Sequence, residues 1–326
     1  MSLLDRSLPA MGATARIVLA DRAPGAAASP RLTHAADDAQ ALLATLERQW
    51  TRFAPDSALN LLNDDPRTEV PAGAHVRALI RAGAWAGRIS GGLVDMTLGA
   101  QIAQAGYDAH WDGSLAVPLA AALAAAPPRA AATPDPAARW QGLGVDRRAG
   151  TIRRPPGVTL DSGGLGKGLA ADLVAARLTG LRYVVDVGGD LALGHGGRGH
   201  HEVVVRHPLT DAPAHVFRLG GGGVATSGIH RRLWRDRHGD PAHHLLDPST
   251  GRPAWTGLLT ATAVGRSALH AETLAKTALL QGAHGARTTL SALGGVLVHE
   301  DGAVEAVPAL RRTALRAARD LAAATA

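Results

Sequence analysis

The segment Asp161-Ser-Gly-Gly-Leu-Gly-Lys-Gly168 decides how this chain is assigned to a fold. It follows a strand-like run over 151–160 and opens a helix predicted over 168–178. Glycines at the start of a helix can bring backbone amides, and here also the Lys167 ammonium, against a phosphate. The segment is neither a Walker A loop, which needs Ser or Thr after the lysine, nor a Rossmann fingerprint. A glycine-rich turn with a solvated lysine is the alternative.

Apolar periodicity on either side of this segment predicts a mixture of helices and strands. Helices are predicted over 32–50, 76–89, 116–126 and 268–281. Strands are predicted over 13–20, 183–187, 203–205, 258–264 and 296–299, and a proline-alanine loop over 127–136. Because helices and strands do not alternate strictly, their order favours the α+β class over a doubly wound sheet. No linker or internal repeat divides the chain, so we expect a single domain over 1–326 with a helical tail over 309–326.

The composition excludes several classes of function. The 326 residues include no cysteine, which removes disulfides, thiolate zinc sites and cysteine nucleophiles. A formal charge of +6 suits nucleic acid or a substrate that carries phosphates, but aromatic residues make up only 3%, too few for a base-stacking surface. Charged residues interrupt the N-terminal segment 1–20, and no apolar stretch is long enough to span a bilayer. We therefore expect a cytoplasmic protein that does not insert into membranes and does not bind nucleic acid.

Two further segments contain glycines or hydroxyls that suit a phosphate-bearing ligand. In Asp186-Val-Gly-Gly-Asp190, adjacent glycines allow the backbone to approach a ligand closely, although a tight turn capped by Asp190 is the alternative. Ala225-Thr-Ser-Gly228 is followed by Arg231 and Arg232, and hydroxyls with arginines suit a phosphate or a ribityl chain. An ordinary β-turn followed by a basic strand is the alternative for this second segment.

Two other segments contain side chains that could take part in chemistry. Within His243-His-Leu-Leu-Asp-Pro-Ser-Thr-Gly251, a neutral His244 could take the proton of a reacting hydroxyl, or it could be a hydrogen-bonded histidine in a turn. In Ala271-Glu-Thr-Leu-Ala-Lys276, Glu272 and Lys276 are four residues apart on a predicted helix. They could form a surface ion pair, or Glu272 could hold a cation beside the phosphates.

These five segments occur in an order that resembles the ApbE family, the FAD:protein FMN transferases. The resemblance also includes Met11-Gly-Ala13, the segment Arg52-Phe-Ala-Pro-Asp-Ser-Ala-Leu-Asn60, and Gly91-Gly-Leu-Val-Asp-Met-Thr-Leu-Gly99, in which Met96 replaces a proline. It extends from about residue 11 to residue 298, which is most of the chain.

The resemblance implies an α+β fold with FAD bound in a central cleft. It implies an enzyme that uses Mg²⁺ to move FMN from FAD onto a Thr or Ser hydroxyl of an acceptor protein, with release of AMP. The alternative is an ApbE-like FAD-binding protein or FAD hydrolase with weakened or lost transferase activity. A nucleic-acid-binding protein with an incidental basic charge is a third interpretation.

The resemblance also implies which residues form the site. The FAD-binding residues would be Met11, Phe53, Leu93, Val94, Asp95, Asp161, Lys167, Thr226, Ser227 and His244. His244 is the candidate base, with a role in positioning the ligand equally open, and Glu272 is the second candidate catalytic residue. The Gly164 carbonyl and the Glu272 carboxylate would be the metal ligands. Lys276 departs from the family, which has a metal-binding Thr there, because a protonated lysine has no lone pair to offer a metal.

Overall fold

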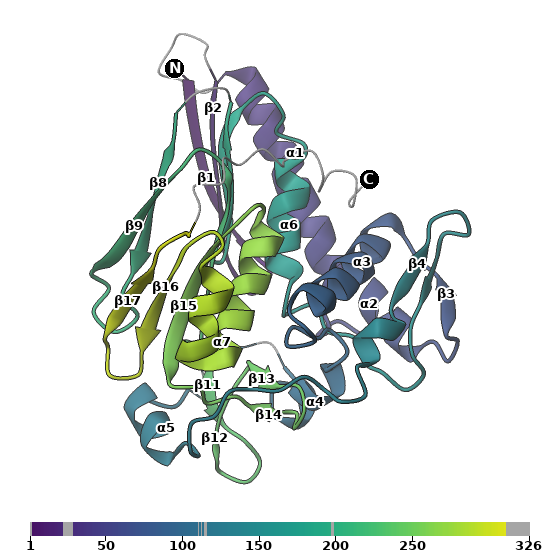
Figure 1. Cartoon of the computed structure of the whole chain (residues 1–326). Helices are drawn as coiled ribbons and strands as arrows, with labels where there is room; N and C mark the ends of the chain where they lie inside the picture. Colours follow the sequence, from purple (N-terminus) through teal and green to yellow (C-terminus); the bar gives the residue numbers. More distant parts are fainter. Residues whose placement is uncertain are drawn as a thin grey trace.

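The computed structural model describes residues 2–310 except 22–28, 110, 112, 114, 115, 197 and 198. Its largest element is an antiparallel sheet in the order β1-β2-β6-β7-β10-β15-β16-β17 (Figure 1). The strands of this sheet are β1 (Ser2–Ala10), β2 (Ala13–Asp21), β6 (Arg182–Val187), β7 (Asp190–His195), β10 (Gly222–Gly228), β15 (Leu258–Gly265), β16 (Gly295–His299) and β17 (Val304–Val307). The sheet therefore combines strands from both ends of the described chain.

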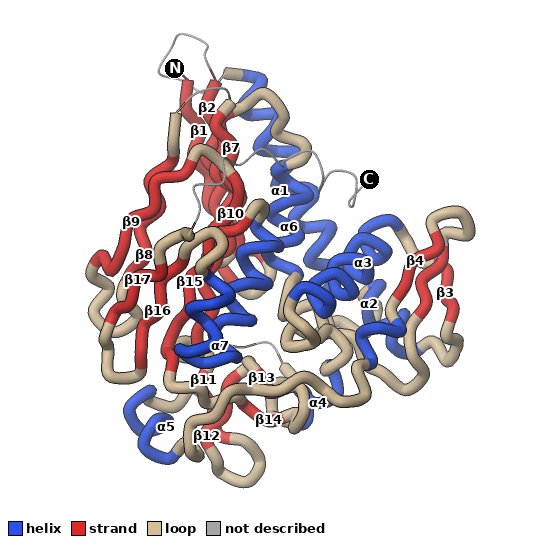
Figure 2. Tube along the Cα trace, in the orientation of Figure 1, coloured by secondary structure: helices blue, strands red, loops and turns tan. Residues whose placement is uncertain are grey.

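Three helices cover one face of this sheet, as Figure 2 shows: α1 (Pro30–Trp50), α6 (Gly166–Ala175) and α7 (Ala268–Leu290). The hairpin of β8 (His201–Arg206) and β9 (Pro213–Leu219) packs on the other face. Alternate residues of β7 point to the two faces, because side chains alternate along a strand. Ala192 accordingly belongs to the core under the helices, whereas Leu193 packs against Val203 of the hairpin.

The remaining elements lie around the ends of α1, α6 and α7. A small sheet, β3 (Glu69–Pro71), β5 (Thr151–Arg153) and β4 (Gly144–Asp146), lies beside α2 (Ala58–Asp64) and α3 (Ala74–Ile89). The other short elements are α4 (Gly99–Gln104), α5 (Leu119–Ala125), the 3₁₀ turn η1 (Arg139–Gly142), and the paired strands β11 (Leu233–Arg235) with β12 (Pro241–His243) and β13 (Leu246–Asp247) with β14 (Arg252–Pro253).

The N-terminus of α7 is fixed by side chains from two elements. Ser267 caps it by accepting the backbone N–H of His270. Asp172 of α6 accepts the N–H groups of Ala268 and Leu269 at 2.8 and 3.0 Å, which satisfies two donors that a helix start leaves free. Burial raises the pKa of Asp172 to about 6. These bonds hold α6 and α7 in one relative position.

The structure confirms the predicted mixed α/β class, and most predicted elements are present. The strand predicted over 151–160 ends at Arg153, and the helix predicted over 116–126 begins only after Pro118. In α7 the helix predicted over 268–281 ends at a kink, because Gly282 has a positive φ of 67°. Of the predicted tail 309–326, residues 311–326 lie outside the described residues. No helix within 2–310, apart from the gaps named above, is long and apolar enough to cross a bilayer.

Candidate functional site

Two cavities lie next to each other at the start of α6. The inner cavity has a volume of about 180 Å³ and is mostly apolar. Its apolar lining is Met11, Trp50, Phe53, Leu93, Val94, Leu98, Ile102, Tyr107, Leu245, Leu246 and Leu280. The outer cavity is wider, about 1200 Å³, and lies between the β8–β9 hairpin and the open face of β2, β6, β7 and β10. The same residues line both cavities where they meet: Gly12, Gly163, Lys167, Arg232, His244 and Lys276.

A two-residue turn brings the β1–β2 hairpin into this junction. Ala10 pairs with Ala13, so Met11 and Gly12 form the turn, with φ of 54° and 67°. Positive φ at both central residues is the geometry of a type I′ hairpin turn, which favours glycine. The Met11 N–H donates to Glu47 Oε1 at 2.8 Å, and this bond attaches the turn to α1.

Asp161 organises the glycine segment at the start of α6. Its Oδ1 accepts the Gly163 N–H at 2.7 Å, and its Oδ2 pairs with Arg52 Nε at 2.9 Å. The Arg52 guanidinium in turn lies 4.4 Å from the centre of the Phe53 ring and 4.9 Å from that of Tyr107. The inner cavity therefore has a wall of aromatic rings and an arginine, which suits a flat ring system.

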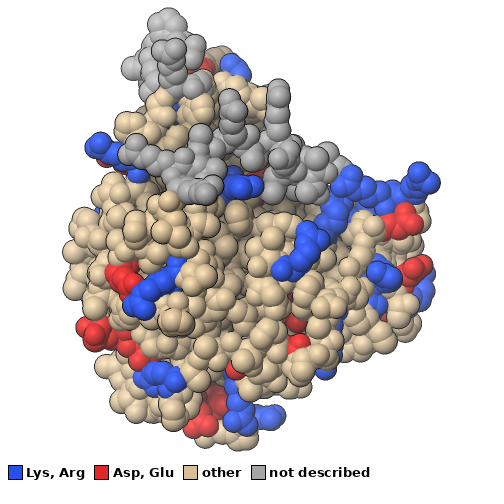
Figure 3. Space-filling model, in the orientation of Figure 1, with Lys and Arg blue, Asp and Glu red and all other residues tan. Residues whose placement is uncertain are grey.

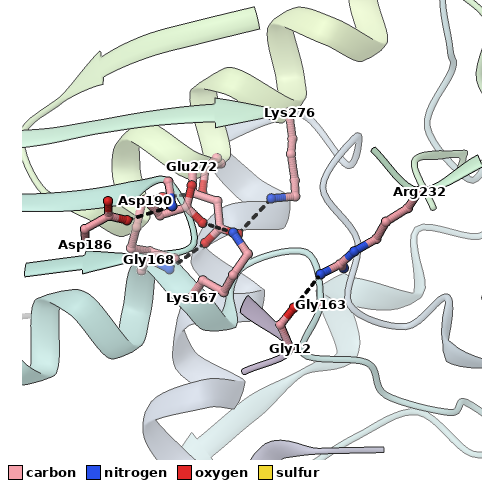
Figure 4. Close-up of polar contacts among 12 residues, drawn as sticks. Gly12, Gly163, Lys167, Gly168, Asp186, Asp190, Arg232, Glu272 and Lys276 are labelled. Atoms are coloured by element: carbon pink, nitrogen blue, oxygen red, sulfur yellow. Dashed lines mark hydrogen bonds and ion pairs between the residues drawn. The ribbon is translucent and has the colours of Figure 1, made fainter. Parts of the chain in front are cut away.

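Behind the glycine segment, Glu272, Asp190 and Lys276 are buried and form a cluster with the partly exposed Lys167 (Figure 4). Lys276 Nζ donates to Glu272 Oε1 at 2.8 Å, and Lys167 Nζ lies 3.8 Å from the same oxygen. Lys167 also pairs with Asp190 at the start of β7, and the Gly168 N–H donates to Glu272 Oε2 at 2.8 Å. The surface ion pair that the sequence left open is wrong, because Glu272 is fully buried and Lys276 nearly so. The solvated lysine is wrong as well, because Lys167 is only partly exposed and pairs with Asp190.

The charges of this cluster shift the pKa values of Lys167, Glu272 and Asp190. Burial alone would lower the pKa of Lys167, but the Asp190 and Glu272 carboxylates outweigh it and raise that pKa. Burial alone would raise the pKa of Glu272, but the ammonium groups of Lys276 and Lys167 hold it below its ordinary value. Burial and the nearby Glu272 raise the pKa of Asp190 to about 7. In formal charge, the two lysines balance the two carboxylates with which they pair.

The residues around Glu272 do not fit the Mg²⁺ site that the sequence predicted. Mg²⁺ needs oxygen ligands in a nearly octahedral arrangement. Both Glu272 oxygens already accept hydrogen bonds, one from Lys276 and one from the Gly168 N–H. Gly164 lines the inner cavity, and within the described residues no group of three or more His, Asp or Glu side chains could hold a metal ion.

His244 lies between β12 and β13 and lines both cavities. Burial, and after it the positive charges of Arg232, His243, Lys276 and Lys167, keep the pKa of His244 well below its ordinary value. Its Nδ1 is buried and has no hydrogen-bond partner within the described part of the chain. A neutral imidazole at this position can accept a proton or a hydrogen bond from a ligand.

Asp95 lines the inner cavity and has a second unpaired polar atom. Its Oδ1 accepts the N–H and the hydroxyl of Thr97 at 2.8 and 2.7 Å, whereas Oδ2 is buried without a partner among the described residues. Burial raises the pKa of this carboxyl group. Because a buried unpaired oxygen is costly, Oδ2 is suited to accept an N–H from a bound ring system.

The structure brings most of the predicted FAD-binding residues together. The inner cavity contains Met11, Phe53, Leu93, Val94, Asp95, Asp161, Lys167 and His244. Thr226 and Ser227 line only the outer cavity, and Glu272 lies behind the two lysines and lines neither. The sequence did not predict Tyr107, which stacks on Trp234 with ring centres 5.4 Å apart. The chain has only two tyrosines, and this scarcity was the one feature of the sequence that could have drawn attention to Tyr107.

On the face that Figure 3 shows, Lys and Arg form one short strip at the upper right and are otherwise scattered among Asp and Glu and broad areas that carry neither charge.

The site can be compared with known proteins. A model of the ApbE family matches residues 11–298 of this chain. The FAD:protein FMN transferase of Escherichia coli (strain K12) is 34% identical over 124 residues, which cover 36% of this chain and 35% of that protein. The FAD:protein FMN transferase of Treponema pallidum is 31% identical over 181 residues, which cover 47% of this chain and 50% of that protein.

The fold has close relatives among solved structures. The crystal structure of the ApbE protein of Thermotoga maritima has a TM-score of 0.75 with this chain, at 22% identity, and the match covers 93% of this chain and 96% of that one. The similarity to the curated E. coli and T. pallidum proteins is more local, since it spans 35% and 50% of their lengths. The structural likeness establishes the fold, and the family model includes every segment that forms the two cavities.

Proposed function

The chain belongs to the ApbE family, and on that premise we propose that it is an FAD:protein FMN transferase. It moves FMN from FAD onto a Thr or Ser hydroxyl of an acceptor protein and releases AMP. The observation that carries this proposal is the meeting of two unlike cavities at Lys167, Arg232, Lys276 and His244. The mostly apolar inner cavity suits a ring system, the wider outer cavity of mixed lining suits a second substrate, and the cations between them suit the phosphates that react.

In this proposal the inner cavity takes a ring system of FAD. Phe53, Tyr107 and the Arg52 guanidinium supply flat contacts, and Asp95 Oδ2 accepts an N–H from the ring. The pyrophosphate then lies at the junction, where the backbone of the glycine segment and the first turn of α6 face it. The acceptor hydroxyl enters through the outer cavity, which is large enough for a polypeptide segment.

The reaction exchanges a phosphoanhydride bond for a phosphoester bond. The acceptor oxygen forms a bond to the phosphorus on the FMN side, and the bond from that phosphorus to the bridging oxygen breaks, so that AMP leaves. His244, which is neutral, takes the proton of the attacking hydroxyl. The ammonium groups of Lys167 and Lys276 and the Arg232 guanidinium stabilise the negative charge on the phosphoryl oxygens. No step is assigned to Mg²⁺, because Glu272 is already bonded to the chain's own donors.

The proposal is tested by incubating the purified protein with FAD and candidate acceptor proteins. Mass spectrometry of the acceptor should find the mass of FMN less one water on a Thr or Ser, and chromatography should find an equal amount of AMP. AMP and free FMN in the absence of an acceptor would identify an FAD hydrolase instead. FAD that stays intact with every acceptor, although it binds, would identify a flavin-binding protein without transferase activity.

The cellular location and the domain organisation belong to the same proposal. A cytoplasmic location, expected from residues 1–20, and one functional unit over the whole chain both remain predictions. Fractionation of cells that express the untagged protein would test the location.

A further inference from the structure

We propose that Lys276 takes the place of a metal ion in this chain, so that FAD binds and is cleaved without a divalent cation. The inference deepens the proposed function, because it assigns to one residue the cationic role at the pyrophosphate. It begins from the disagreement between the expected Mg²⁺ site and the residues that surround Glu272.

The contacts of Glu272 show that its side of the site is already filled. The carboxylate is fully buried, and each of its oxygens accepts a bond of 2.8 Å, one from Lys276 Nζ and one from the Gly168 N–H. A metal ion at this carboxylate would have to displace an ammonium group that is held by a charge-assisted hydrogen bond in a buried place. Lys276 is four residues after Glu272 on the same helix, so the two side chains are neighbours as soon as the helix forms.

The formal charges lead to the same conclusion. Lys167 and Lys276 offset Glu272 and Asp190, and the cluster as a whole carries no excess of negative charge. Sites for Mg²⁺ combine carboxylates with substrate phosphates and usually keep several waters. A neutral cluster with ammonium groups at its open side instead suits an anion.

The position of Lys276 places its charge where the two cavities meet. Its side chain is 9% exposed, yet it contributes to the lining of both cavities. Figure 4 shows Lys276 extending from α7 toward the Glu272–Lys167 group, and Arg232 approaching Gly12 from the other side. Glu272 thus acts as a positioning residue, which holds the Lys276 ammonium at the edge of the cavities.

The experiment measures FAD and riboflavin affinity by flavin fluorescence, in EDTA and in millimolar Mg²⁺. For the wild type we expect FAD affinity to be the same in both buffers. Lys276→Met should weaken FAD binding in EDTA by about 10- to 100-fold, the range for loss of one charged hydrogen bond, and leave riboflavin affinity unchanged. Lys276→Arg should keep most of the FAD affinity. Arg266→Met is the matched control, because it removes one exposed positive charge beside α7 and outside both cavities.

Two results would overturn the inference. One is a wild type that binds FAD only when Mg²⁺ is present, and the other is a Lys276→Met variant with unchanged FAD affinity in EDTA. Lys276→Met leaves the Glu272 carboxylate without its ammonium partner and could fail to fold. In that case the double variant Glu272→Gln with Lys276→Met, which removes both charges, is used in the same titrations. Failure of the transferase proposal is seen separately, as the absence of AMP and modified acceptor in every buffer, since the affinity measurements do not need turnover.

Discussion

Substituting Gly168 should show that the close approach of α6 and α7 holds the cation cluster in place. A Cβ atom at Gly168 would lie 2.8 Å from the carbonyl oxygen of Ala268, 2.8 Å from Glu272 Oε2 and 2.9 Å from the Ala268 carbonyl carbon. Two of these atoms are backbone atoms of the first turn of α7, so the contact cannot be relieved by rotating a side chain. Alanine at this position must therefore push α7 away or break the bond from the Gly168 N–H to Glu272.

The size of the effect follows from three contributions. Overpacking of a tight core contact costs about 1–3 kcal/mol. Weakening of a hydrogen bond to a buried carboxylate costs about 1.5–3 kcal/mol. The better helix propensity of alanine offsets about 1 kcal/mol of this cost. We expect Gly168→Ala to lower the free energy of unfolding by about 1.5–5 kcal/mol and to weaken FAD binding, because Glu272 and Lys276 move with α7.

Urea unfolding followed by tryptophan fluorescence measures the loss of stability, and an FAD titration measures the loss at the site. Gly220→Ala is the control, because its Cβ would meet only the Gly199 carbonyl oxygen at 3.9 Å and its φ is not positive. The control should stay within about 0.5 kcal/mol of the wild type. A Gly168→Ala protein that is as stable as the control and binds FAD normally would refute the idea that this contact positions the cluster.

Three further predictions concern single side chains. Lys167→Ala should weaken FAD binding by about 1.5–3 kcal/mol, through loss of a charged hydrogen bond to the phosphates, and an unchanged titration would remove Lys167 from the phosphate site. His244→Ala should lower turnover by about 10²–10⁴-fold with little change in FAD affinity, and an equal loss of both would make His244 a binding residue. His243 is fully buried, and burial lowers its pKa to about 3, so the unfolded chain takes up the proton first as the pH falls below about 6.5. The wild type should therefore lose about 2 kcal/mol of stability between about pH 7.5 and pH 5 that His243→Gln does not lose, and an identical pH dependence in urea unfolding would contradict this.

The elements that the sequence predicted well are those whose pattern is local. The helix over 268–281 has a regular apolar spacing and ends at Gly282, and the run 258–264 is apolar throughout because β15 is buried along its whole length. Strand β10, by contrast, has the sequence Gly-Gly-Val-Ala-Thr-Ser-Gly, which predicts a turn. It is a strand because β7 and β15 pair with it on both sides, and those partners come from distant parts of the chain. Strand β1 was missed for a related reason, since it is an edge strand that pairs only with β2 and carries charged residues.

For the site, too, the sequence could predict local pairs of residues but not the contacts between distant parts of the chain. The four-residue spacing of Glu272 and Lys276 allows them to pair on any helix, whether the pair faces water or the core. What buries the pair is the contact of α7 with α6, and that contact depends on Gly168, more than a hundred residues earlier in the chain. A surface pair of this kind contributes a few tenths of a kcal/mol, whereas a buried pair that loses one partner costs about 3–5 kcal/mol. Burial of the Glu272–Lys276 pair therefore fixes the Lys276 ammonium group at the junction of the two cavities. A mobile surface lysine could not hold its charge against a phosphate in this way.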